Sequence, residues 1–101
     1  MQYRTIPGLD AETSLLGFGC MRLPVDSSGQ IDEAAATAMI DHAIANGVNY
    51  FDTAYGYHNE QSESFIGRAL CSRHPRESFY LADKLPVWKT PDVESAEEVF
   101  Q

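Results

Sequence analysis

The feature that most constrains the fold of this chain is an alternation of short apolar segments with amphipathic helical segments. Three apolar segments have strand character: residues 15–18, 48–51 and 79–82. Their starts lie about 30 residues apart, which is typical of consecutive β-α units in a parallel sheet. Helical segments follow the first two, and a third helix begins near the end of the chain. The order strand, helix, strand, helix, strand, helix predicts an α/β fold with a parallel sheet.

Capping residues place the ends of the predicted helices. Asp32 is a suitable N-cap for a helix over residues 32–46, and Gly47 is suited to end it. A second helix is predicted over residues 61–71, before the break at residues 72–76. The segment from Ser95 to Glu98 reads as a capping box that starts the third.

The first 16 residues predict a β-hairpin. Residues 3–6 and 13–16 have some strand character, and Pro7 and Gly8 between them mark a turn. We expect this hairpin to cover one end of a larger structure.

Composition and charge narrow the classes of function. The chain has 101 residues, which suit a single domain spanning 1–101, and is 44% hydrophobic. A net charge of −8 with scattered basic residues argues against a nucleic-acid surface. We expect no membrane segment and a cytoplasmic location, because no apolar run approaches the length of a span.

The cysteine and histidine pattern favours neither disulfides nor a metal site. Cys20 and Cys71 lie far apart and are expected to be reduced thiols. His58 with Glu60 and Glu63 is the one group that resembles a ligand cluster, but surface loops often mix such residues. No metal is predicted.

Glycines at the end of the first predicted strand suggest a nucleotide site only weakly. Gly17 and Gly19 begin a dinucleotide-binding pattern, yet its third glycine is absent and Pro24 prolongs the loop where a helix should begin. The better interpretation is a strand end whose small residues let another group approach the backbone closely.

Chemically useful side chains follow the ends of successive predicted strands. Asp52 ends the second strand, Tyr57 follows it by five residues, and Lys84 follows the third strand. Ligands and catalytic groups of parallel α/β folds lie at these carboxyl ends. A lysine ammonium beside a tyrosine stabilises its phenolate, and a carboxylate keeps the lysine charged. The three residues together therefore predict a proton donor to a carbonyl oxygen.

These segments resemble the aldo/keto reductase family over essentially the whole chain. The resemblance rests on LGFGCMRLP at residues 16–24, D-T-A from Asp52, the tyrosine five residues later, S-E-x-x-x-G-x-A-L at residues 62–70, and Lys84 in LADKLP. It implies a (β/α)8 TIM barrel whose bottom is closed by the hairpin. About 250 residues make such a barrel, so this chain corresponds to the N-terminal three β/α units, an incomplete barrel. The KLPVW sequence looks more like the bacterial branch with a C-terminal iron-sulfur domain.

The resemblance also implies roles for individual residues. Tyr57 would protonate the carbonyl oxygen of a small aldehyde or ketone as hydride arrives from NADPH, Lys84 would stabilise the phenolate, and Asp52 would pair with Lys84. The residues implied to border the nicotinamide are Gly19, Cys20, Met21 and Asp52. Trp88 would line the substrate pocket.

Two departures leave other functions open. The family's fourth catalytic residue, a histidine after the fourth strand, has no counterpart among His42, His58 and His74, and the later cofactor-binding loops are not represented. We therefore expect at most feeble activity from this chain alone. The alternatives are a truncated, non-catalytic binding or assembly module that self-associates through open sheet edges, and a small nucleotide-binding α/β domain.

Overall fold

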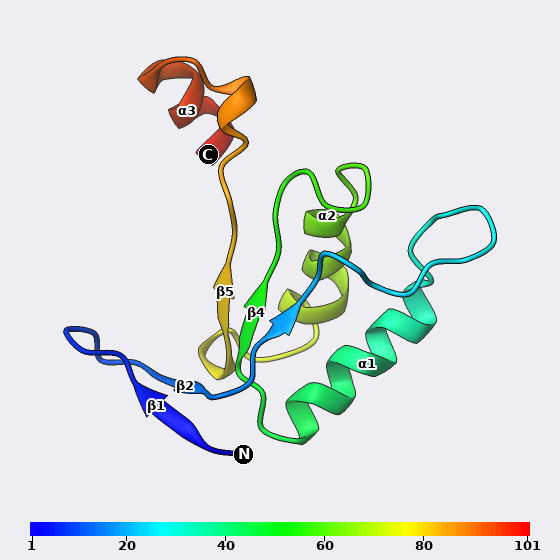
Figure 1. The fold of residues 1–101 in the computed structure, drawn as a ribbon, viewed down its shortest axis with the longest axis vertical. Coiled ribbons are helices and arrows are strands. Elements are labelled where there is room, and N and C mark those ends of the chain that lie inside the picture. The colour runs from blue at the N-terminus through cyan, green and yellow to red at the C-terminus, as the bar shows by residue number, and fades with distance from the viewer.

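The computed structural model describes residues 1–101 and shows a flat sector of an α/β fold (Figure 1). Its extents are 44 × 40 × 20 Å, so one dimension is half of the other two. A small parallel sheet runs through the middle with two helices beside it, while the N-terminal hairpin and the C-terminal helix project from opposite ends. None of the helices has the length and apolar character needed to cross a membrane.

The predicted N-terminal hairpin is confirmed with shorter strands. β1 (Tyr3–Thr5) pairs antiparallel with β2 (Glu12–Ser14), and Tyr3 lies opposite Ser14. The Tyr3 hydroxyl donates to the carbonyl oxygen of Gly47 at 2.8 Å. This contact connects the hairpin to the segment that enters the central sheet.

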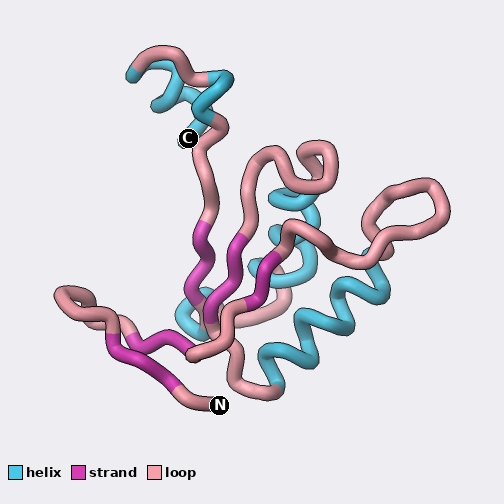
Figure 2. The backbone as a smooth tube through the Cα atoms, in the orientation of Figure 1, coloured by secondary structure: helices cyan, strands magenta, loops and turns pink.

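Three parallel strands form the central sheet in the order β3-β4-β5, as the alternation predicts (Figure 2). These strands are β3 (Phe18–Gly19), β4 (Tyr50–Asp52) and β5 (Tyr80–Ala82). The register places Gly19 beside Asp52, and Asp52 beside Ala82. The outer edges of β3 and β5 have no neighbouring strand.

The first strand is shorter than predicted. Residues 15–17 were expected to belong to it, but Leu15 and Leu16 are 59% and 62% exposed and lie in a bend. The Ser14 hydroxyl donates to the Leu16 carbonyl at 2.6 Å, which holds the chain in a turn between hairpin and sheet. Most of the apolar run therefore connects the hairpin to the sheet. Only its last residue, Phe18, belongs to β3 and pairs with β4.

The first helix agrees with its predicted caps. α1 (Glu33–Ala45) begins after Asp32, whose side chain accepts from the Ala35 amide at 3.1 Å. Gly47 follows the helix with φ of +92°, a conformation that L side chains rarely adopt. Ala36 and Ile40 are fully buried against the sheet side of the core.

The second predicted helix is confirmed in extent but changes its hydrogen-bond pattern. α2 (Ser62–Ile66) continues into a single π-helical turn, Gly67–Cys71. Its buried face contributes Phe65, Ile66 and Leu70 to the core. Just after it, the Arg73 guanidinium donates two hydrogen bonds of 2.8 Å to the Asp41 carboxylate of α1, which fixes the two helices together.

The last helix begins earlier than predicted, because its N-cap lies three residues before Ser95. α3 (Val93–Phe100) has Asp92 as its N-cap. Ser95 is not the N-cap but the third residue of the helix, and it forms the capping box together with Asp92. The Asp92 carboxylate accepts from the Ser95 amide at 2.8 Å, which satisfies a donor that a serine cap would have left to water. Two 3-10 turns, Arg76–Ser78 and Val87–Lys89, flank β5.

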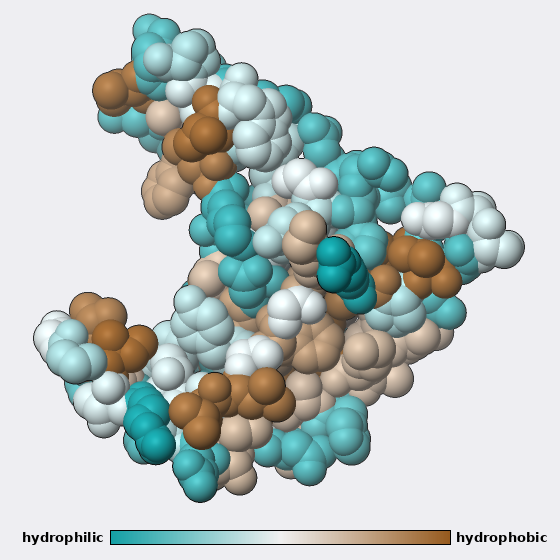
Figure 3. Space-filling model, viewed as in Figure 1, coloured by the Kyte–Doolittle hydropathy of each residue, from teal (hydrophilic) through white to brown (hydrophobic).

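The core lies on one face of the sheet only. Phe51 is fully buried there, with a tilted ring contact to Phe18 and an edge-to-face contact to Phe79, and α1 and α2 cover it. Because side chains alternate along a strand, the neighbouring Asp52 points to the opposite face. That opposite face is not covered by a helix, and Figure 3 shows polar and apolar atoms lining the concave side between the projecting ends.

Candidate active site

Lys84 connects the ends of two strands and the loop between β4 and α2. Its ammonium donates to the Asp52 carboxylate at 2.7 Å, the Thr53 carbonyl at 3.0 Å and the Tyr57 hydroxyl oxygen at 3.1 Å. An ammonium has three N–H donors, so each has one acceptor. The structure thus brings together the three residues that the sequence predicts to be catalytic.

A buried polar contact shapes the loop that carries Tyr57. The hydroxyls of Thr53 and Ser62 are 2.8 Å apart, and both residues are at most 1% exposed. This contact joins the start of the loop to the first residue of α2. The Ser62 amide also donates to the Tyr57 carbonyl at 3.2 Å, so Tyr57 occupies a closed turn with its backbone fixed. Neither Thr53 nor Ser62 was singled out from the sequence, although both lie in the motifs quoted for the resemblance.

The contacts of Lys84 keep its side chain charged. The hydrogen bond to Asp52 raises the pKa of the Lys84 ammonium, partial burial opposes this, and the hydrogen bond to Tyr57 adds to the rise. Lys84 is therefore a cation at neutral pH. Because the lysine donates, the Tyr57 oxygen is the acceptor in their contact, and the tyrosine's own proton is free for another partner.

Cys20 lies next to this cluster, but its thiol is expected to be unreactive. Its amide donates to the Asp52 carbonyl at 2.8 Å, and the residue is fully buried. Burial first, and then the Asp52 charge, raises the pKa of the Cys20 thiol to about 12, against an opposing contribution from Lys84. The thiolate is the reactive form of cysteine, so these surroundings suit a packing role for Cys20 better than a nucleophilic one.

The other residues expected at the nicotinamide lie at the end of β3. Gly19 is beside Asp52 in the sheet, and an added Cβ at Gly19 would meet no atom within 4 Å. Met21 is 58% exposed. The backbone next to Asp52 is therefore open to a flat ligand on this side. The three histidines lie outside the cluster: His42, His58 and His74 contact Asn46, Leu23 and Asp41.

Comparison with known proteins identifies the family. Residues 15–99 match the Aldo/keto reductase family. The chain belongs to this family. It is 36% identical over 76 residues to probable aldo-keto reductase 1 of Glycine max, and 34% identical over 92 residues to protein tas of Escherichia coli. These matches cover 75% and 84% of this chain, and 22% and 25% of the relatives.

A solved structure of the family is also similar in fold. It is an aldo-keto reductase from Bacillus halodurans in its holo form, with a TM-score of 0.66 and 37% sequence identity. The match covers 82% of this chain and 25% of the Bacillus protein. The chain thus spans about a quarter of the length of these family members. The likeness fits part of an aldo/keto reductase barrel, and bacterial proteins are among the relatives.

Trp88, the residue expected to line the substrate pocket, lies against the loop that carries Tyr55 and Tyr57. It belongs to the 3-10 turn Val87–Lys89 and is 68% exposed. A Cβ added to Gly56 would lie 3.5 Å from the Trp88 ring, so the ring contacts the loop backbone between the two tyrosines.

A second lysine cluster adjoins the first and was not predicted from the sequence. The Lys89 ammonium donates to the Tyr55 hydroxyl oxygen at 2.8 Å and to the Glu60 carboxylate at 3.2 Å. The hydrogen bond to Tyr55 and then that to Glu60 raise the pKa of Lys89. In the sequence, only the presence of two lysines and two tyrosines in adjacent loops hints at this cluster.

One carboxyl next to the site holds its proton to a higher pH than an ordinary glutamate does. Burial, followed by the hydrogen bond and charge of Asp83, raises the pKa of the Glu63 carboxyl to about 7. Asp83 precedes Lys84, and its carboxylate accepts from the Lys84 amide at 2.8 Å. Glu63 lies in the first turn of α2, so this pair lies between the helix and the strand end that carries Lys84.

Proposed function

We propose that Asp52, Tyr57 and Lys84 form part of the active site of an NADPH-dependent oxidoreductase that reduces an aldehyde or ketone to an alcohol. The observation that carries the proposal is the Lys84 ammonium, which lies within hydrogen-bond distance of both the Asp52 carboxylate and the Tyr57 hydroxyl. Membership of the aldo/keto reductase family supports the same reaction class.

The residues have distinct tasks in this reaction. A bound NADPH supplies a hydride to the carbonyl carbon. Tyr57 donates its hydroxyl proton to the carbonyl oxygen, which completes the alcohol and leaves a phenolate. The Lys84 ammonium, 3.1 Å from that oxygen, stabilises the negative charge as it forms. Asp52 keeps Lys84 charged and oriented, so the positive charge is in place before the proton moves.

The end of β3 fits the cofactor that this reaction needs. Gly19 leaves the backbone beside Asp52 uncovered, and the exposed Met21 side chain offers an apolar surface next to it. We propose that Gly19, Cys20 and Met21 border the nicotinamide. The buried Cys20 contributes its backbone, which the hydrogen bond to Asp52 fixes in position.

The reaction is tested by completing the barrel with a relative of known structure. In the chimera, residues 1–101 replace the matching quarter of the Bacillus halodurans reductase. We expect carbonyl-dependent oxidation of NADPH, with one alcohol formed per NADPH, on any aldehyde that the Bacillus parent reduces. The parent is the control for substrate and assay. A folded chimera that binds NADPH and forms no alcohol would contradict the proposal.

Residues 1–101 alone are proposed to have little or no activity and to self-associate. The unpaired edges of β3 and β5 expose backbone groups. Next to β3 lies a groove of about 520 Å³ with a mainly apolar lining that includes Leu16, Phe18 and Met39. Sedimentation velocity should show concentration-dependent association that Met39→Lys weakens. A monomer at all concentrations would contradict this proposal.

A further inference from the structure

His58, the residue after Tyr57, begins an unusual stretch of backbone. His58, Asn59 and Glu60 have φ of +53°, +53° and +66°, so three consecutive non-glycine residues adopt the left-handed conformation. Their Cβ atoms disfavour it, although histidine and asparagine tolerate it better than most residues. Such a stretch persists only where surrounding contacts hold it. The contacts made by His58 are therefore informative.

The ring of His58 reaches across to the loop that follows β3. Its Nε2 accepts a hydrogen bond of 3.0 Å from the backbone amide of Leu23. Leu23 is buried and lies outside every helix and strand, so its amide has no partner in a regular ladder. An amide can only donate, so Nε2 carries a lone pair. The half-buried ring is thus neutral, with its proton on Nδ1.

This hydrogen bond is one of two that join segment 20–23 to segment 52–58, and together the two segments form a frame around the proposed site. At one end the Cys20 amide donates to the Asp52 carbonyl, and at the other the Leu23 amide donates to His58. The ends of segment 20–23, which carries the proposed nicotinamide contacts, are therefore held by the two ends of segment 52–58. Tyr57 lies inside this frame, one residue before the histidine.

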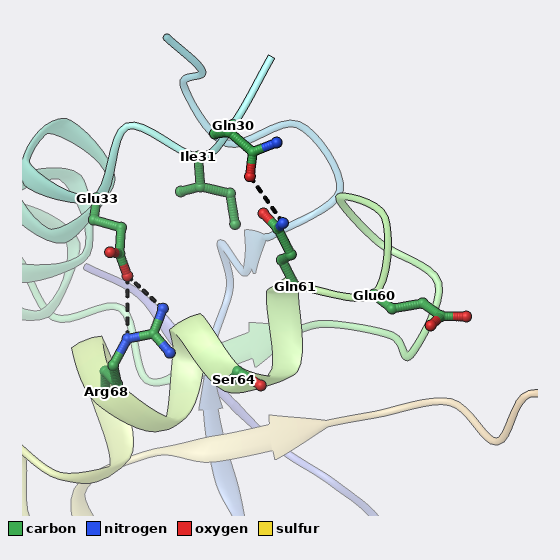
Figure 4. A pocket seen from close by; sticks show the side chains of 7 residues that line it. All are labelled: Gln30, Ile31, Glu33, Glu60, Gln61, Ser64 and Arg68. Carbon is green, nitrogen blue, oxygen red and sulfur yellow. Dashed lines mark hydrogen bonds and ion pairs between the residues drawn. The ribbon is translucent and has the colours of Figure 1, made fainter. Parts of the chain in front are cut away.

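The left-handed turn directs neighbouring side chains to different loops. Glu60 pairs with Lys89 on the C-terminal side of the site, and Gln61 donates to the Gln30 side chain at 2.8 Å. Figure 4 shows Gln61 and Gln30 pointing toward each other while Glu60 points away from them. The Gln61 contact is exposed and involves two flexible side chains, so it cannot replace the partly buried contact at Leu23.

We propose that His58 is a positioning residue that holds the segment from Cys20 to Leu23 at a fixed distance from Tyr57. It sets the spacing between the proton donor and the face where the nicotinamide is proposed to bind, without touching either reacting group. The inference rests on the proposed function for its catalytic consequence. The structural part, one neutral ring that fixes two loops, does not depend on activity.

The structural part is tested on the 101-residue chain by NMR. In the unmodified protein we expect the ring nitrogens of His58 to show a protonated Nδ1 and an unprotonated Nε2 coupled to the Leu23 amide. His58→Leu, which lacks an acceptor, should speed exchange of the Leu23 amide by about tenfold and shift the signals of Cys20, Met21 and Tyr57. A ring with its proton on Nε2, or unchanged Leu23 exchange in the variant, would overturn the proposal.

Two further variants separate the hydrogen bond from the backbone conformation. His58→Asn keeps a residue that tolerates the left-handed conformation but is too short to reach Leu23, so it should behave like His58→Leu. His58→Gln tolerates that conformation less well but offers a carbonyl acceptor, so it should partly restore slow exchange. The reverse ranking would assign the effect to backbone strain and overturn the positioning role.

Kinetics of the barrel-completed chimera test the catalytic part. His58→Asn should lower kcat by about 10- to 100-fold with little change in the KM of the carbonyl substrate, because misplacement affects the transition state more than binding. Equal kcat in the two chimeras would overturn the role. If the unmodified chimera is itself inactive, the proposed function fails, and the NMR result on the 101-residue chain still decides whether His58 fixes the two loops.

Discussion

The two lysine clusters of this chain have nearly the same chemical groups and differ in how they are held. Lys84 donates to an aspartate and a tyrosine, and Lys89 donates to a glutamate and a tyrosine. Each ammonium also lies over the ring of its tyrosine, at 4.9 Å for Lys84 and 4.7 Å for Lys89. Residue types and distances alone do not tell the two clusters apart.

The difference lies in the elements that carry the groups. Asp52 belongs to β4, Lys84 follows β5 by two residues, and the third donor of Lys84 is directed at the Thr53 carbonyl. Lys89 lies in a 3-10 turn, and Glu60 in the left-handed stretch of a loop. Strand ends place the first cluster beside Gly19 and the open end of β3. We therefore assign the proposed catalytic role to the cluster that is anchored to the sheet, whereas the Lys89 cluster connects one loop to another.

Removing each lysine in turn gives the largest expected contrast between the clusters. In the barrel-completed chimera, Lys84→Met should lower kcat for carbonyl reduction by about 100-fold or more, because a charge that stabilises the phenolate is lost. Lys89→Met should change kcat by less than about threefold, since an exposed ion pair contributes little. Steady-state kinetics with NADPH measure both. Equal losses would mean that the two clusters act together.

The reactivity of the two thiols tests how well the protein excludes solvent at Cys20, beside the Lys84 cluster. Cys20 is fully buried with its pKa raised to about 12, whereas Cys71 is exposed at the end of the π-helical turn. At pH 8 we expect one thiol to react quickly with a disulfide reagent and Cys20 to react at least about 100-fold more slowly. Cys71→Ser should remove the fast phase. A fast phase that survives in this variant would show that the end of β3 opens readily.

The pH dependence of stability tests the carboxyl pair Glu63 and Asp83, which lies next to the Lys84 cluster and has no counterpart at Lys89. The pKa of Glu63 is raised from 4.5 to about 7, so between these values the folded chain holds a proton that the unfolded chain releases. Stability should therefore fall as pH rises from about 4.5 to about 7. Glu63→Gln should flatten this part of the Tm profile by a few degrees at most, because the site is partly hydrated.

Glu94→Gln, in the exposed first turn of α3, is the matched control for that measurement. It changes the same chemical group away from any partner carboxylate and should leave the slope between these pH values as it is in the unmodified chain. If Glu63→Gln and Glu94→Gln give the same profile, burial and Asp83 do not raise the pKa of Glu63.

Local sequence signals were sufficient for the elements and for the three clustered residues. Asp32 and Gly47 fix both ends of α1, and strand alternation brings Asp52 and Lys84 to one edge. The signals failed where a contact outside the segment decides the outcome. The bend at Leu16 depends on the Ser14 hydroxyl, and the start of α3 on Asp92, which competes with Ser95 as the cap.

Contacts between loops were beyond the reach of sequence patterns. The Lys89 cluster joins residues 29 and 34 positions apart, and the His58 to Leu23 hydrogen bond spans 35. No periodicity connects such positions, and the left-handed backbone that aims His58 and Glu60 involves no glycine. The resemblance implied the contact of Tyr57 with Lys84, but only the folded structure shows that Tyr55 meets Lys89.

The most direct test of the central claim exchanges each tyrosine for phenylalanine in the barrel-completed chimera. Both substitutions remove one hydroxyl that accepts from a lysine, so their effects on packing are closely matched. Our account predicts that Tyr57→Phe lowers kcat by about 10²- to 10⁴-fold, the usual contribution of a positioned general acid, while Tyr55→Phe stays within about threefold of the unmodified chimera. Equal kcat for the Tyr57→Phe and unmodified chimeras would contradict it.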